Sequence, residues 1–398
     1  MVPSPIPTPA NSSEAGAVMT SAAQAPRVDR LVGEAVYMYA FDVAYEMDRR
    51  PVATLLGRPV AEFSVDASKR SPRQLFFFRP QMVRLPSLER LTPRGAVRVE
   101  RAVKMLPVGA ISITFRVPFA VDRLEELTGF HDFRFSDGSY LSDEARRLAW
   151  DVRVELAPHL VRPVERLRED EAYTVFCIHG PLCAADGTTV RCEDWLSANR
   201  RQVAAVLTEE PDPGLLSDQE AEESTGKSYS YYDRDLVVID WDAALVIDEP
   251  RNFDETLYLM ELANTQLAEL EAYDRILDDS IERSYRDVAA RRFRGFQTTR
   301  IQAALREIRI DMARLSDELS NITKFFGDWH AARIYQGVSS RFHLSDWHRA
   351  IDDKLKTVDD LYQLLRSEQN HRSMMVLEVS VVVMFVIDLV ILAAGLKK

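Results

Sequence analysis

The residues that decide the fold are EAVYMYAFDVAYE, positions 34–46, where every second residue from Tyr37 to Tyr45 is aromatic or valine. This period of two, with its aromatic and branched side chains, is typical of a β-strand. Four further stretches share this character, and Gly or Pro lies close to most of them. They are RQLFFFRPQMVRL (73–85), VGAISITFRVPF (108–119), YTVFCIHGPL (173–182) and DLVVIDWDAALVID (235–248). We therefore expect a region of short strands separated by turns.

Helical spacing occurs between these strands, in DRLEELTGF (122–130) and DEARRLAWDVRVEL (143–156). Strands and helices in one region predict an α+β fold, a mixed α/β soluble domain over residues 30–250. Within it, the acidic segment 209–228 contains two prolines and predicts a surface loop. The Pro-, Ser- and Ala-rich residues 1–29 cannot bury enough apolar surface to fold, and we expect a disordered tail there.

From residue 251 to 372 the apolar period becomes helical and predicts an elongated coiled-coil stalk. Apolar residues follow an alternating spacing of four and three, which is the seam of a coiled coil. The first seam contains Ile301, Leu305, Ile308, Met312, Leu315, Leu319, Ile322 and Phe326, and the second contains Ile351, Leu355, Val358, Tyr362 and Leu365. Such seams serve either packing within one chain or self-association, and the sequence leaves both open.

The chain ends in HRSMMVLEVSVVVMFVIDLVILAAGLKK, residues 371–398. The segment 373–396 would be about 36 Å long as a helix at ~1.5 Å per residue, enough for a hydrocarbon core of roughly 30 Å. It therefore predicts one C-terminal transmembrane helix, with His371 and Arg372 at the membrane entry. Glu378 and Asp388 lie inside this segment, and intramembrane acids usually face other protein, so we expect an oligomer of spans. The predicted location is a single-pass membrane protein with the bulk of the chain on the cytoplasmic face.

Composition restricts the partners. The net charge of −12 excludes a general polyanion binder, so contact with RNA or anionic lipid requires a local basic patch. Residues 283–314 contain nine arginines and only three acids. Arg291, Arg292, Arg294 and Arg300 are the centre of this candidate patch for an anionic partner. The alternative is a solvated helix face.

Three cysteines without a CxxC motif argue against a disulfide framework and suit a reducing compartment. Cys177, His179, Cys183 and Cys192 lie within sixteen residues and form a weak zinc candidate. Their spacing matches no familiar zinc finger or ribbon, and buried cysteines are often simple hydrophobes. We predict no metal, no cofactor and no small-molecule substrate.

The segment RAIDDKLKTVDDLYQLLRSEQNHRSMMVLEVSVVVMFVIDLV (349–390) resembles the ending of the required-for-meiotic-nuclear-division family of membrane proteins, in a bacterial-type form. In that family a leucine-rich helix meets a single span that carries a Glu, and His371, Arg372 and Glu378 are the matching positions. The resemblance implies a single-pass oligomer without enzymatic activity. It also implies that the protein tethers ribosomes to a membrane, as its mitochondrial relatives are thought to do.

The resulting hypothesis is a non-enzymatic, self-associating scaffold or tether that is anchored at a membrane by its C-terminus. Its expected partners are membrane lipid, further copies of the chain and, through the arginine patch, the ribosome or RNA. One alternative is an ion or proton pathway lined by Asp388 in an oligomer of spans. Another is an enzyme with an unseen site in the N-terminal domain.

Overall fold

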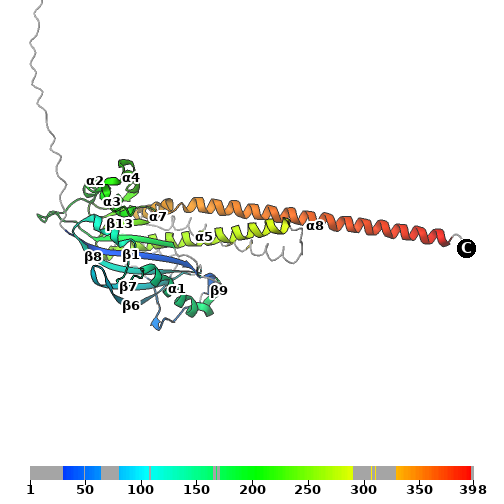
Figure 1. Cartoon of the computed structure of the whole chain (residues 1–398), viewed down its shortest axis with the longest axis horizontal. Helices are drawn as coiled ribbons and strands as arrows, with labels where there is room; N and C mark the ends of the chain where they lie inside the picture. Colours follow the sequence, from blue (N-terminus) through cyan, green and yellow to red (C-terminus); the bar gives the residue numbers. More distant parts are fainter. Residues whose placement is uncertain are drawn as a thin grey trace, which may run out of the picture.

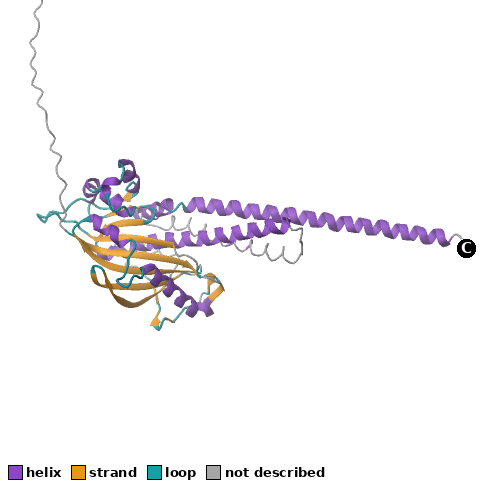
Figure 2. Cartoon of the chain, viewed as in Figure 1, coloured by secondary structure: helices purple, strands orange, loops and turns teal. Residues whose placement is uncertain are grey.

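A computed structural model describes residues 30–48, 50–63, 80–106, 109–164, 167, 171–289, 306, 310 and 329–395. It confirms the α+β fold: a large mixed sheet carries helices on both faces, and two long helices extend away from it (Figures 1 and 2). The architecture is therefore a layered domain with a helical arm.

The central feature of the domain is a nine-stranded sheet with the order β11-β12-β13-β10-β1-β8-β7-β6-β5. Its strands are antiparallel to their neighbours, except that β10 and β13 are parallel. Two small sheets pair β2 with β9 and β3 with β4. The strands are β1 (Leu31–Asp42), β2 (Ala44–Met47), β3 (Thr54–Leu55), β4 (Arg58–Pro59), β5 (Ala61–Glu62), β6 (Gln81–Thr92), β7 (Gly95–Met105), β8 (Ala110–Val121), β9 (Leu160–Pro163), β10 (Glu171–His179), β11 (Ser228–Tyr229), β12 (Leu236–Ile239) and β13 (Ala243–Asp248).

The helices form the outer layers and the arm. The α-helices are α1 (Leu141–Leu156), α2 (Cys192–Ala198), α3 (Arg200–Leu207), α4 (Asp218–Ser224), α5 (Phe253–Ala289), α7 (Trp329–Arg341) and α8 (Leu344–Gly395). The 3-10 helices are η1 (Leu124–Phe130), η2 (Ala157–His159), η3 (Pro213–Leu215) and η4 (Pro250–Asn252). The segment 209–228, which the sequence predicts as a loop, thus contains η3 and α4.

Strand β1 lies in the middle of the sheet and explains the alternation at positions 34–46. Along its whole length it pairs with β8, from Leu31 opposite Val121 to Asp42 opposite Ala110, and on its other edge it pairs with β10. Tyr37, Tyr39 and Phe41 point into one hydrophobic core, while Val36 and Met38 point into a second. Because both faces are buried, the strand needs apolar residues at nearly every position.

Each face of the sheet has its own core. On one face, side chains of η1, α1, α2 and α3 pack against the strands. On the other face, α5, α7 and α8 pack against β1, β10, β12 and β13. The packing of α5 and α8 against these strands joins the helical arm to the sheet. The arm therefore begins inside the domain.

Helices α5 and α8 leave the sheet side by side (Figure 1). Ile351, Leu355 and Val358 of the predicted second seam are buried in the core that contains Leu270 and Leu277 of α5. Beside them, Lys354 Nζ lies 2.7 Å from a carboxylate oxygen of Asp274 and 2.7 Å from one of Asp278. This part of the seam packs within one chain. The first seam, 301–326, falls almost entirely outside the described residues, so the coiled-coil stalk remains a prediction.

The predicted transmembrane helix is wrong. In the part of the chain that the structure describes, no helix has both the length and the apolar character needed to cross a membrane. The apolar run is the far end of α8, one continuous helix of 52 residues that contains Glu378 and Asp388. Carboxylates inside a span cost a few kcal/mol each, a cost that the sequence analysis treated as offset. The single-pass membrane localisation and the membrane-entry role of His371 and Arg372 are corrected with it.

Two local elements differ from their prediction. The helical spacing at 122–130 forms the 3-10 helix η1, and a complete strand, β7, occurs where the sequence analysis placed none. In strand β7, Val99 and Val103 are separated and flanked by charged residues in RVERAVK (98–104). The stretch therefore shows no clear apolar alternation in the sequence. Its position between β6 and β8 becomes important for the site below.

Replacing Gly33 by alanine should destabilise the sheet by about 1–3 kcal/mol, the usual cost of forcing extra atoms into a packed region. A Cβ atom at this position of β1 would overlap the carbonyl oxygen of Cys177 and lie 2.9 Å from the ring of Phe119. Urea unfolding measures the change. As a control, a Cβ at Gly129 meets only the mobile end of Arg94, at 2.8 Å, so Gly129→Ala should cost less than about 0.5 kcal/mol. Equal costs would contradict this account.

Candidate functional site

One face of the sheet changes from apolar to polar between neighbouring strands. On β1, Val36 and Met38 face α5 within the second core. On β8, Arg116 is paired with Val36 and Thr114 is paired with Met38. Thr114 is paired in turn with Ala102 of β7. The side of the sheet made by β6, β7 and β8 therefore presents polar groups to the same helix that covers the apolar side.

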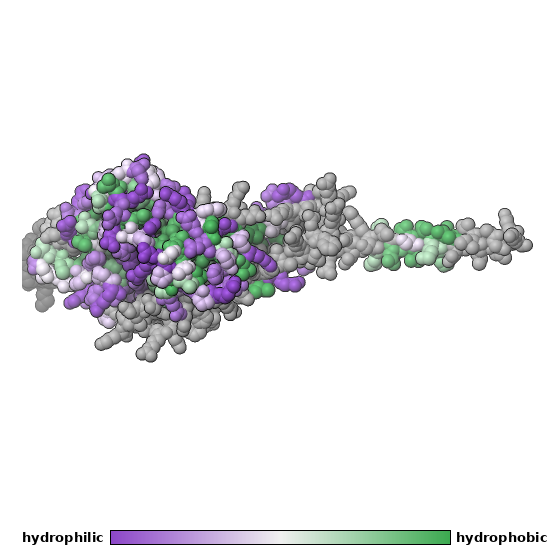
Figure 3. All heavy atoms as spheres, turned by 90° about the horizontal axis from the view of Figure 1, so that it is seen from below, coloured by the Kyte–Doolittle hydropathy of each residue, from purple (hydrophilic) through white to green (hydrophobic). Residues whose placement is uncertain are grey.

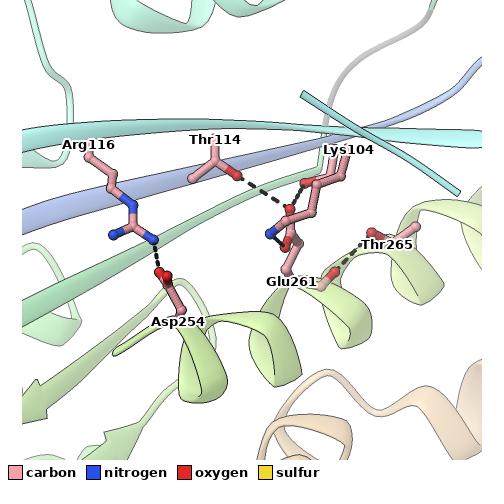
Figure 4. Close-up of polar contacts among 7 residues, drawn as sticks. Lys104, Thr114, Arg116, Asp254, Glu261 and Thr265 are labelled. Atoms are coloured by element: carbon pink, nitrogen blue, oxygen red, sulfur yellow. Dashed lines mark hydrogen bonds and ion pairs between the residues drawn. The ribbon is translucent and has the colours of Figure 1, made fainter. Parts of the chain in front are cut away.

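Glu261 of α5 is the centre of a buried polar network (Figure 4). Its carboxylate forms an ion pair with Lys104 of β7 and accepts a hydrogen bond from Ser112 Oγ at 2.6 Å and one from Thr114 Oγ1 at 3.3 Å. The side chains of Lys104 and Glu261 are only 11% and 4% exposed. A charge at this depth is tolerated only when it is paired and hydrogen-bonded, which this network achieves.

Arg116 of β8 forms a second charged cluster at the beginning of α5. Its guanidinium is 3.2 Å from Glu34 Oε1 and also pairs with Asp254. Burial raises the pKa of the Glu34 carboxyl, and the Arg116 guanidinium opposes this shift. Together with the Lys104–Glu261 pair, these contacts fix the first turns of α5 on the polar side of the sheet.

A cavity of about 270 Å³ opens beside these two clusters. It is lined by Phe63, Met82, Arg84, Leu85, Ser87, Arg98, Glu100, Arg101, Ala102, Lys104, Thr114, Arg116 and Asp254. Five of these residues are basic and two are acidic. We call this space the basic cavity, and it lies in a protein whose overall charge is −12.

The basic residues of the cavity differ in how they are neutralised. Arg101 is held by Glu144 of α1, with Nη1 3.1 Å from Oε1, and donates from Nε to the carbonyl of Pro86 at 3.0 Å. Arg84 and Arg98 are exposed. Arg98 donates a hydrogen bond to Ser87 Oγ at 3.0 Å. Within the described part of the chain, neither Arg84 nor Arg98 forms an ion pair.

Aromatic residues close the buried end of the basic cavity. The ring of Phe63 lies 5.2 Å from that of Tyr258 on α5, and Lys104 Nζ is 4.3 Å from the centroid of Phe63. A cation over an aromatic face at this distance is attracted by the ring quadrupole. The cavity therefore combines a cationic rim, a paired lysine at its base and an apolar wall. Polar and apolar groups arranged in this way can orient a small anion.

A second, smaller cavity of about 110 Å³ lies at the end of β1 that contains Asp42, against the middle of α5. Four carboxylates line it, those of Asp42, Glu171, Glu271 and Asp279, together with Arg275. Burial raises the pKa of Asp42 from 3.8 to about 7, and the Arg275 guanidinium opposes the shift. Arg275 itself pairs with Glu271 at 3.2 Å. These groups are mutual partners within the fold.

A third cavity, of about 380 Å³, is lined by four acids and Arg234. Two of its carboxylates already act as structural acceptors. Asp235 accepts from the backbone N–H groups of Tyr231 and Tyr232 at 2.9 and 2.5 Å, and Asp248 accepts from Asn252 Nδ2 at 2.9 Å. Acids committed to backbone and side-chain donors are poor candidates for ligand binding, so the basic cavity is the stronger site.

The structure does not bring the four zinc candidates together. Cys177 is buried in the core beneath α5, whereas Cys192 is buried in the core on the opposite face of the sheet. Cys183 is exposed, and the His179 ring lies 6.0 Å from that of Phe253. No group of three potential metal ligands occurs among the described residues. Cys177 and Cys192 are accordingly core residues.

The other predicted site residues are distributed along the arm. His371, Arg372, Glu378 and Asp388 all belong to α8, and the Glu378 side chain is exposed. Arg291, Arg292, Arg294 and Arg300 lie outside the described residues, so their contact with an anionic partner stays a prediction.

A family model described as the N-terminal domain of Uncharacterized protein MJ0711 matches residues 32–254. The chain belongs to this family. The matched region of the MJ0711 N-terminal domain runs from β1 to the start of α5 and contains every residue that lines the basic cavity. Glu261 and the helical arm lie beyond it.

Uncharacterized protein MJ0711 of Methanocaldococcus jannaschii is 23% identical over 164 residues, which are 41% of this chain and 51% of that protein. The chain thus spans about half the length of this curated relative. No solved structure matches the chain. These comparisons overturn the resemblance to the required-for-meiotic-nuclear-division family, which rested on a short leucine-rich ending, and membership of the MJ0711 N-terminal domain family replaces it.

The sequence analysis missed the basic cavity of this MJ0711-type domain. The signal was present as two alternations: Arg98, Glu100 and Lys104 at every second or fourth position of one stretch, and Ser112, Thr114 and Arg116 in another. Charged residues at a period of two place their side chains on one face of a strand. The acceptor Glu261 is more than 140 residues away from Ser112 in sequence, so the pairing itself could not be predicted.

Truncating Glu261 to alanine should lower the free energy of unfolding by about 3–5 kcal/mol, because Lys104 would remain buried without its carboxylate. The double replacement Lys104→Met with Glu261→Leu removes both charges and should cost less than the single truncation. Urea unfolding of the three proteins tests this. Glu282→Ala, at a 70% exposed position of the same helix, is the control and should be nearly neutral. A single truncation costing less than about 1 kcal/mol would show that the pair is not needed.

Asp42 should make stability depend on pH. Because the folded state raises its pKa from 3.8 to about 7, the folded protein binds more protons than the unfolded chain between these values. Its contribution to the free energy of unfolding is therefore most favourable near pH 4 and falls as the pH rises through about 7. Asp42→Asn should gain stability relative to the wild type over this range, by on the order of 1–3 kcal/mol at pH 8. A difference that stays constant from pH 4 to 8 in chemical unfolding would refute this assignment.

Proposed function

We propose that the chain is a non-enzymatic scaffold that self-associates through the far part of α8. The observation that carries this proposal is a band of exposed apolar side chains on that helix (Figure 3). The side chains are 50–70% exposed on the single chain. They are Met374, Met375, Leu377, Val379, Val381, Val382, Val383, Met384, Phe385, Val386, Ile387 and Leu389.

Apart from Glu378 and Ser380, the described side chains from Met374 to Ile387 are apolar, and they are not restricted to one stripe of the helix. Consecutive positions such as Val382, Val383 and Met384 point in directions about 100° apart, yet all are exposed and apolar. A helix that is hydrophobic all round is stable only when it is buried on every side. The far part of α8 therefore fits the interior of a bundle of helices better than the two-sided seam of a dimer.

Further copies of the same helix are the partner that the geometry favours. The described part of α5, Phe253–Ala289, packs against α8 around residues 351–358, before the apolar band begins. The band thus continues a helix whose first part is already a packing element of the chain. Identical apolar helices that leave their domains in the same direction can associate in a symmetric bundle.

The self-association predicted from the sequence is kept here without its membrane anchor. A ribosome or RNA partner, which the sequence analysis linked to the arginine patch, has no support from the described residues and is not part of the proposal. An enzymatic site in residues 30–250 likewise stays a prediction.

The double variant Val382→Glu with Phe385→Glu should break the assembly, because it places two carboxylates on one face of the apolar band. Light scattering of the full-length wild type should give a mass that is a multiple of the single-chain mass of 45.3 kDa, while the variant should approach 45.3 kDa. Burying two unpaired charges costs several kcal/mol, enough to shift an assembly constant by more than about a hundredfold.

The control variant Leu215→Glu changes a leucine that is 74% exposed on the globular domain. It carries the same chemical change outside the apolar band and should leave the mass unchanged. A wild type that remains a single chain of 45.3 kDa at concentrations of about 50 μM would contradict self-association.

A further inference from the structure

We propose that the basic cavity binds a small phosphorylated molecule. The cavity lies in the MJ0711-type domain, away from the apolar band of α8, and its occupation is a function separate from self-association. The inference rests on three features of the cavity: two cations without an ion-pair partner in the described chain, a base fixed by the Lys104–Glu261 pair, and an apolar wall.

Arg84 and Arg98 supply the free positive charge. They come from the neighbouring strands β6 and β7 and line the same cavity. In contrast, Arg101 is engaged by Glu144, and Arg116 is engaged by Glu34 and Asp254. The five basic residues of the lining outnumber its two acids, Glu100 and Asp254, so a bound anion balances charge as well as gaining hydrogen bonds. A guanidinium presents a planar set of donors that matches phosphate oxygens in a bidentate manner.

The base of the cavity is rigid. Lys104 is only 11% exposed and is held by Glu261 and by the Phe63 ring, so its ammonium group cannot turn away from the cavity as a surface lysine would. Thr114 Oγ1 lies in the same lining and donates to Glu261 at 3.3 Å. A fixed cation at the base and mobile cations at the rim can grip an anion without reorganising the sheet.

The apolar lining indicates an organic ligand. Phe63, Met82 and Leu85 provide an uncharged wall beside the cations. The volume of about 270 Å³ is near the lower limit of small-molecule sites, so it admits a compact phosphorylated molecule. A single-stranded RNA is disfavoured because it requires exposed aromatic platforms for stacking, and Phe63 is only 7% exposed.

The experiment uses the full-length protein and isothermal titration at constant ionic strength. The probes are inorganic pyrophosphate, glucose 6-phosphate and ATP, with sulfate as the non-phosphate anion and a ten-nucleotide RNA as the macromolecular competitor. At least one phosphate compound should bind once per chain with a Kd between about 1 μM and 1 mM, and sulfate should not saturate. Tighter binding of glucose 6-phosphate or ATP identifies an organic phosphate, and tighter binding of pyrophosphate identifies the inorganic anion.

The double variant Arg84→Gln with Arg98→Gln should weaken this binding by at least about tenfold, because it removes the charge-assisted hydrogen bonds of both guanidinium groups. Both arginines are exposed, so the variant should unfold at the temperature of the wild type. The matched control Arg146→Gln with Arg200→Gln removes two exposed arginines of α1 and α3 outside the cavity and should bind like the wild type.

Three outcomes would overturn the proposal: no saturable binding of any of the three phosphate probes, binding that the double cavity variant does not weaken, or binding of RNA in the absence of phosphate-probe binding. The light-scattering mass reports self-association independently. A wild type that assembles but binds no phosphate probe would refute only the cavity, and a single chain that binds a probe would refute only the scaffold.

Discussion

The structure depends on β1, a strand that is paired on both edges and buried on both faces. Its ladder with β8 extends over the full strand, and its ladder with β10 attaches the β12–β13 side of the sheet. Successive side chains along β1 enter the two cores in turn. This one strand therefore packs against both the layer of α1 to α3 and the layer of α5, α7 and α8. A change of register by one residue would exchange the two cores, which makes this register strongly specified.

Helix α5 covers the apolar side of this sheet face and also contributes a charged partner to its polar side. Helix α5 buries Leu257, Leu259 and Met260 beneath the β1–β10 region and, within the next turn, directs Glu261 toward Lys104. A buried carboxylate contributes little net stability compared with an apolar residue of the same size, but it fixes the position of its partner. Lys104 is thereby kept at the base of the basic cavity, and the geometry of the cavity is linked to the placement of the arm.

The sequence predicts those parts of the structure that follow from local patterns. Alternation at 34–46 and at 108–119 locates β1 and β8, and the spacing around Ile351 and Leu355 locates the buried face of α8. The sequence does not predict strand β7, because charged residues occupy the face of the strand that lines the basic cavity, where most strands carry apolar residues. The basic cavity could not be predicted either, because Glu261 is paired with residues of β7 and β8 that are distant in sequence. The predicted membrane span is wrong because the apolar side chains were taken to offset the cost of Glu378 and Asp388.

The short strand β11 at one edge of the large sheet restricts how this protein can meet others. Strand β11 consists of Ser228 and Tyr229 alone, so the edge of the sheet that it forms offers only a short row of free backbone donors and acceptors. Proteins commonly shorten their edge strands to prevent strand addition by other chains. A chain protected against strand addition at this edge, yet bearing an apolar helix, would make its contacts through the helix. Assemblies formed in this way would keep their sheet domains separate and their basic cavities independently accessible.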